Sequence, residues 1–212
     1  MIKPSKNVIR LFEYFVIHGF DHTLTEIASG VNLTKRTLHN RFNTRDYLEE
    51  QILSYWKDQM VNRYREKTQF SNHPVESILI LIYELELSII YEFPMYKKEH
   101  SKYDDLNSIE SHFLFPVFLE IIQNGQQTGD FPIDMDPKKY TIFLIFNIIH
   151  LLFQDIIDHI GRLNRSSKRE RISIVNQLFQ VDYIEYLLSA NLTVKGKIKL
   201  KEIDLSLLFI VH

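Results

Sequence analysis

The chain has 212 residues, of which 45% are hydrophobic, and this is ample for a packed core in one or two domains. It has no cysteine, which excludes a disulfide framework and a thiolate metal site and fits a reducing compartment such as the cytoplasm. The formal net charge of −2 hides an asymmetry, because residues 1–47 carry seven Lys/Arg against four Asp/Glu, whereas residues 48–212 carry eighteen against twenty-three.

The N-terminal residues do not have the pattern of a signal peptide. They include basic residues but lack its apolar core. The longest uncharged apolar run, Tyr140 to Phe153, is too short to span a bilayer. We therefore expect a soluble, cytoplasmic protein without membrane contact.

The first predicted helix lies near the N-terminus. Apolar residues recur at helical spacing from Val8 to Val16, and Gly19 follows as a stop signal. A second helix is predicted from Leu24, because Thr23-Leu24-Thr25-Glu26 forms a capping box in which Thr23 and Glu26 satisfy each other's free backbone groups. Asn32 falls in the following turn, where a left-handed backbone is expected.

The next predicted helix begins after Thr34, its N-cap. Leu38 and Phe42 are one turn apart and share its buried face, so Arg36 and Asn40 point outward. The outward face and its flanks carry hydrogen-bond donors and no carboxylate: Lys35, Arg36, Thr37, His39 and Asn40. Arg and Lys can donate to guanine, and Asn can pair with adenine, as a major-groove helix requires. A plain solvated face has the same polarity, so the pattern alone leaves DNA binding open.

Long helices are predicted in the remainder of the chain. The first runs from about Arg45 to Phe70, and the second from Pro74 to Tyr91. Residues 95–103 read as a short helix or loop. A further helix is expected from Asp104 to Gln127, with Pro116 as a kink and glycines at its end.

The last predicted helices span 136–162, with Asp136 as cap, and 168–191. From Ile142 to Ile149 the first of them is apolar at every position except Asn147, so it needs cover on every side. We therefore expect these two helices to form a homodimer. In residues 192–212, Val194, Ile198 and Leu200 alternate with lysines in a strand-like pattern.

From about Asn7 to Leu53 the chain resembles the N-terminal domain of TetR-type (TetR/AcrR) transcriptional regulators. The matching elements, in the family's order and spacing, are Gly19-Phe20, Thr23, Ile27-Ala28 and the run from Thr34 to Phe42. The resemblance implies an all-α fold with a helix-turn-helix DNA-binding domain over 1–47 and a helical effector-binding and dimerisation domain over 48–212. It also implies that Arg45 contacts a DNA phosphate.

Three departures from the family pattern lie within residues 19–39. The turn glycine of the family is Asn32 here, the usual phosphate-contacting tyrosine is His39, and the loop after Gly19 is one residue shorter. His39 can still donate to a phosphate, in a manner that depends on pH. The DNA-binding residues predicted from pattern and resemblance together are Thr23, Thr34, Lys35, Arg36, Thr37, His39, Asn40 and Arg45.

The sequence contains no recognisable catalytic motif. There is no phosphate-cradling glycine loop, no nucleophile elbow and no zinc motif, so no catalytic residue, metal or cofactor is expected. Many aromatic residues lie between Ile78 and Phe153, and a cavity among them would suit a small apolar or aromatic ligand. Tyr83, His112 and His150 are the polar candidates for contacting it.

The sequence therefore predicts a homodimeric transcriptional repressor that binds a palindromic operator in double-stranded DNA and is released by a small ligand. Two alternatives stay open. One is an all-helical protein–protein adaptor without DNA binding, and the other is a helical enzyme with an aromatic pocket.

Overall fold

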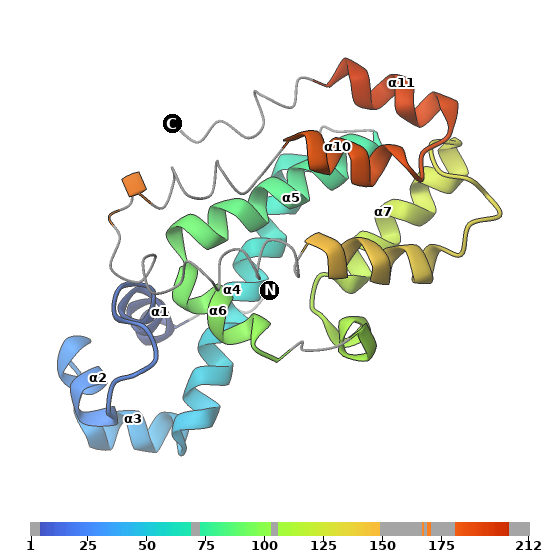
Figure 1. The fold of residues 1–212 in the computed structure, drawn as a ribbon. Coiled ribbons are helices and arrows are strands. Elements are labelled where there is room, and N and C mark those ends of the chain that lie inside the picture. The colour runs from blue at the N-terminus through green and yellow to red at the C-terminus, as the bar shows by residue number, and fades with distance from the viewer. Residues whose placement is uncertain are drawn as a thin grey trace.

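The computed structural model describes residues 5–68, 73–102, 106–148, 167, 169–170 and 181–203. Within these residues every regular element is a helix, which confirms the predicted all-α class (Figure 1). The elements are α1 (Lys6–His18), α2 (Leu24–Gly30), α3 (Lys35–Phe42), α4 (Arg45–Thr68), α5 (Pro74–Tyr91), α6 (Phe93–His100), the 3-10 helix η1 (Leu106–Ser111), α7 (Phe115–Thr128), α10 (Val181–Ser189) and α11 (Val194–Glu202). Residues 137–148 are also helical.

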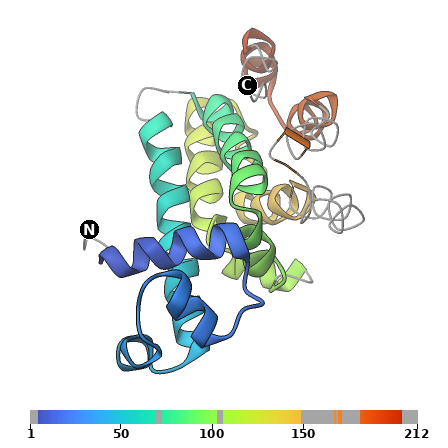
Figure 2. The ribbon, with the colours of Figure 1, turned by 90° about the vertical axis from the view of Figure 1, so that its left-hand side faces the viewer.

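The helices form two groups joined by α4. We call α1 to α3 the reader and the helices after the first turn of α4 the effector region. In Figure 1 the reader lies at the lower left, and α4 runs from it into the bundle of α5, α6 and α7. Figure 2 shows α1 lying across this bundle, where it contacts α4 and α6. The buried side chains form one continuous cluster from Leu11 to Leu200.

The strand-like interpretation of residues 194–200 was wrong, because this segment is α11. The Thr193 hydroxyl caps the helix by accepting from the Gly196 N–H at 3.2 Å. The alternating apolar residues are not its buried face, since Val194 and Ile198 are exposed, and Gly196 and Leu200, four residues apart, are buried. A Cβ on Gly196 would lie 2.5 Å from the Asp130 carbonyl oxygen, so the close approach of α11 requires glycine.

The single helix predicted from Asp104 to Gln127 was also wrong. The described residues form η1 and then α7, and Pro116 stands in the first turn of α7, where its missing N–H is not needed. The proline therefore starts a helix and kinks none. Pro94 likewise stands in the first turn of α6, which occupies most of the segment read as a short helix or loop.

The end of α7 and the start of the next helix agree with the sequence. Gly129 ends α7 in the left-handed conformation, with φ of 80°. Asp136 Oδ1 accepts from the N–H groups of Lys138 and Lys139 at 2.9 and 3.2 Å, as its predicted capping role requires. Residues 149–162, and 168 and 171–180 of the last predicted helix, lie outside the described residues, as do residues 204–212.

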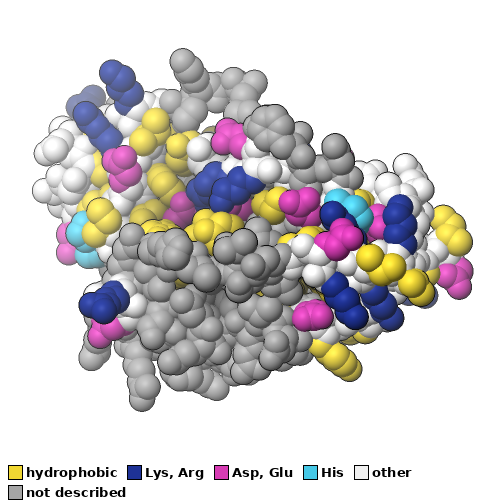
Figure 3. Space-filling view, turned by 90° about the horizontal axis from the view of Figure 1, so that it is seen from above, with side chains coloured by type: hydrophobic (Ala, Val, Ile, Leu, Met, Phe, Trp, Pro, Cys, Tyr) yellow, Lys and Arg dark blue, Asp and Glu magenta, His cyan; other side chains and the backbone are white. Residues whose placement is uncertain are grey.

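Charged side chains distinguish the outer surface of α11. Lys195, Lys197 and Lys201 are exposed there, and Figure 3 shows Lys and Arg side chains gathered on the right-hand part of the described surface. No described helix is long and apolar enough to cross a membrane.

Candidate nucleic-acid interface

The start of α2 is fixed by the predicted capping box. The Thr23 hydroxyl accepts from the Glu26 N–H at 3.3 Å, and the Thr23 N–H donates to Glu26 Oε2 at 2.7 Å. These hydrogen bonds to the carboxylate lower the pKa of Glu26. The Thr23 hydroxyl also donates to Glu26 at 2.8 Å, so the proposed DNA-contacting group already serves the cap.

The turn between α2 and α3 confirms the prediction for Asn32, which has a φ of 55°. The next residue, Leu33, donates its N–H to the Ala28 carbonyl at 2.8 Å and so closes the end of α2. Ile27 and Ala28 are buried against α3 and α1. The turn thus holds α2 and α3 in a fixed relative position.

The outward face of α3 is as the sequence predicted. The Thr34 hydroxyl accepts from the Thr37 N–H at 3.0 Å, while Leu38 and Phe42 are buried. The side chains of the other residues on this helix are exposed: Lys35, Arg36, Thr37, His39, Asn40 and Arg41. Within the described residues, none of the three cations among them forms an ion pair. They are therefore available to an anionic partner.

Two exposed groups near this face were missed by the sequence reasoning. Arg41 adds a third cation, with its guanidinium 5.8 Å from the Phe42 ring centroid. Tyr47 is half exposed in the first turn of α4, where its N–H donates to the Thr44 hydroxyl at 3.1 Å. Its position in the sequence could have identified Tyr47 as a candidate DNA contact, because the start of α4 follows α3 directly.

Arg45 is engaged within the protein. Its Nε donates to Glu49 Oε1 at 2.6 Å, and its terminal nitrogens donate to the backbone carbonyls of Phe20 and His22. The guanidinium thereby ties the start of α4 to the loop before α2. Three protein acceptors already use this side chain, and the phosphate contact stays a prediction.

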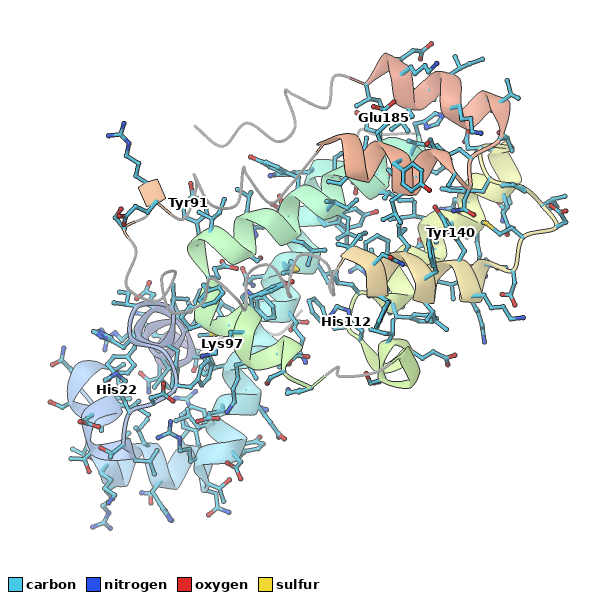
Figure 4. The ribbon with its side chains drawn as sticks, viewed as in Figure 1. His22, Tyr91, Lys97, His112, Tyr140 and Glu185 are labelled. Atoms are coloured by element: carbon cyan, nitrogen blue, oxygen red, sulfur yellow. The ribbon has the colours of Figure 1, made fainter. Side chains whose placement is uncertain are left out.

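A second set of contacts connects the reader to α6. Lys98 Nζ lies 2.9 Å from Glu49 Oε2, and the same ammonium lies 5.5 Å from the Phe20 ring centroid. Glu49 therefore links Arg45 at the reader to Lys98 in the effector region. His22 marks the same loop in Figure 4, with Lys97 on the neighbouring α6.

The predicted ligand residues occupy different surroundings. His112 is fully buried, and burial lowers its pKa to about 3. Its Nδ1 accepts from the Leu114 N–H at 3.2 Å, and Figure 4 shows it in the interior of the effector region. Tyr83 is half-buried, with the Lys67 ammonium 4.6 Å from its ring centroid. His150 lies outside the described residues.

No family model matches the sequence, and no curated protein sequence matches it significantly. Several solved structures are similar to this one. A transcriptional regulator from Cytophaga hutchinsonii is 17% identical, with a TM-score of 0.64 over 88% of this chain and 96% of that one. A fatty acid degradation regulator from Bacillus halodurans is 11% identical, with a TM-score of 0.62 over 83% and 96%. A ketosteroid transcriptional regulator from Mycobacterium tuberculosis is 15% identical, with a TM-score of 0.54 over 90% and 97%.

These similarities cover nearly the whole of each compared chain. Together with the helix-turn-helix of α2 and α3, they show that this chain has the fold of TetR-type transcriptional regulators.

Proposed function

We propose that this protein is a sequence-specific transcriptional regulator that inserts α3 into the major groove of duplex DNA. The observation that carries the proposal is the exposed face of α3, whose cations are unpaired within the described residues while Leu38 and Phe42 anchor the opposite face. Arg36 and Asn40 point farthest from the anchored face and are assigned to bases. Phosphate contacts are assigned to the flanking donors, which are Thr23, Thr34, Lys35, Thr37, His39 and Arg45.

The division of labour proposed for the chain places DNA binding in residues 1–47 and effector binding with dimerisation in 48–212. A dimer would place two readers on the half-sites of a palindromic operator, one or more helical turns apart. In residues 137–148, Phe143 is 44% exposed while Ile148 is buried, so Phe143 and the half-buried Ile142 and Phe146 suit a subunit contact. Ile148 instead belongs to the core of the chain.

We further propose that the protein is a cytoplasmic repressor released from DNA by a small apolar ligand. The names of two similar proteins refer to fatty acid degradation and to ketosteroids, both concerned with largely apolar compounds. Helix α4 runs from the reader into the effector region, and the contact of Lys98 with Glu49 adds a second connection. A ligand that prefers one reader spacing would change operator affinity by about 1–3 kcal/mol.

A protein–protein adaptor with the same fold is the alternative, and an enzyme is disfavoured because the similar structures are regulators. Selection of bound sequences from random duplex DNA separates these functions. We expect the wild-type protein to enrich a palindromic sequence, and Arg36→Ala to relax one position of each half-site at a cost of about 1–3 kcal/mol. Enrichment of no sequence by the wild-type protein would refute the proposal and favour the adaptor.

A further inference from the structure

A cleft of about 440 Å³ lies between the carboxyl-terminal end of α4, the start of α5 and one face of α7. Neither Tyr83 nor His112 lines it. With a rise of 1.5 Å per residue, the lining residue Tyr64 lies about 30 Å along α4 from Arg45. The cleft is therefore remote from the reader.

The cleft combines an apolar floor with a protonated hydroxyl. Val117 and Ile121 are buried residues one turn apart on α7, and both line the cleft. Tyr64 also lines it, and burial raises the pKa of its hydroxyl, which stays protonated and is hydrogen-bonded to the Thr68 and Ser77 side chains of the same lining. A short hydrocarbon segment fits this floor, with hydroxyl groups beside it.

Two opposite charges border this floor. Arg65 and Glu120 line the cleft, and their charges act on the same Tyr64 hydroxyl with opposite sign. Both side chains are exposed, and neither forms an ion pair within the described part of the chain. An Arg guanidinium suits a carboxylate through two parallel hydrogen bonds, and a Glu carboxylate accepts from an ammonium.

Polar contacts connect one wall of the cleft to α11. His73 Nδ1 accepts from the Val75 N–H at 3.3 Å, and His73 Nε2 lies 3.3 Å from the buried Asp130 Oδ1. The Asp130 carbonyl in turn accepts from the Thr193 N–H at 2.9 Å, at the start of α11. This wall is therefore formed before any ligand arrives, which lowers the entropy cost of binding.

We propose that the cleft binds a small zwitterion, with its carboxylate on Arg65, its ammonium on Glu120 and its short hydrocarbon part on Val117 and Ile121. This ligand class differs from the apolar ligand proposed above, and its binding does not depend on DNA binding. The two can therefore fail separately.

Isothermal titration with straight-chain ω-amino carboxylates, from β-alanine to 6-aminohexanoate, tests the proposal on the full chain. We expect one chain length to bind best, and Arg65→Gln and Glu120→Gln each to weaken it at least tenfold. Lys97→Gln, an exposed charge change on α6, is the matched control and should leave binding unchanged. Circular dichroism establishes that each variant is folded.

Butyrate and butylamine, which each carry one of the two charges, complete the comparison. We expect both to bind at least tenfold more weakly than the best zwitterion. The proposal is overturned if no ω-amino carboxylate binds at millimolar concentration, if butyrate or butylamine binds equally well, or if neither cleft substitution weakens binding.

Discussion

The exposed face of α3 and the contacts between α4, α5 and α6 differ in how their charges are paired. On α3 the cations face outward without carboxylate partners in the described residues, whereas Arg63 of α4 lies 3.2 Å from Glu84 of α5 and 2.9 Å from Glu92, which stands between α5 and α6. Lys57 likewise lies 3.0 Å from Glu99 of α6. Ion pairs connect the helices of the effector region, while the cations of α3 have no such partner in the described residues and are proposed to bind DNA. A substitution should therefore change stability in one region and DNA affinity in the other.

The largest effect on stability is expected at Trp56, which is fully buried between helices and donates from Nε1 to Glu92 Oε2 at 2.7 Å. Trp56→Ala should lower the free energy of unfolding by about 3–5 kcal/mol in urea titrations. Trp56→Phe keeps most of the packing and loses the hydrogen bond, so it should cost about 1 kcal/mol. The DNA affinity of the folded fraction should be unchanged. A loss of DNA-binding free energy as large as the loss of stability would contradict the distinction between the two regions.

The next largest effect is expected on dimerisation, at the proposed subunit contact. Phe143→Arg places a charge on the exposed apolar face of residues 137–148 and should raise the dimer dissociation constant about a hundredfold, or about 3 kcal/mol. Sedimentation velocity measures this change. Ile148→Arg is the matched core substitution and should unfold the chain. A dimer unaffected by Phe143→Arg would place the interface elsewhere.

Acid should destabilise the effector region through His112. Burial lowers its pKa from the ordinary 6.5 to about 3, so between these pH values only the unfolded chain binds the proton, and stability falls as the pH falls. Between pH 7 and pH 5 the loss from this group is about 2 kcal/mol. Urea titrations at both pH values should show a smaller decrease for His112→Gln than for the wild-type chain. An equal decrease would exclude His112 as the cause.

A small effect is expected at the cap of α3. Thr34→Ala removes the acceptor for the Thr37 N–H and should cost about 1 kcal/mol of stability, whereas Thr34→Ser should retain most of it. Thermal unfolding of the two variants measures the difference. Equal stability of the Ala and Ser variants would show that the cap contributes nothing.

The sequence predicted the reader well because its geometry is set locally. The Thr23 box, the Thr34 cap and the left-handed Asn32 each depend on residues within a few positions. Arg45 was harder, because its partners Phe20 and His22 are more than twenty positions away and are backbone carbonyls. No periodicity or motif reports such a contact.

The effector region was predicted less well. Pro116 fits both a kink and a helix start, and only the 3-10 turn before it decides between them. Alternating lysines in α11 fit a strand until the capping hydroxyl of Thr193 and the buried Gly196 are known. The cleft between α4, α5 and α7 joins residues from three helices, so no sequence window contains it.

The salt dependence of duplex DNA binding tests the central claim most directly. The wild-type protein and a Lys35→Ala/Arg36→Ala/Arg41→Ala variant are titrated with duplex DNA at several salt concentrations, with both kept folded as judged by circular dichroism. For the wild type, the logarithm of the association constant should fall with the logarithm of salt by about 0.9 per phosphate neutralised, and the variant should bind more weakly with a shallower slope. Equal affinity and equal slope for the two proteins would contradict the assignment of α3 as the DNA-reading helix.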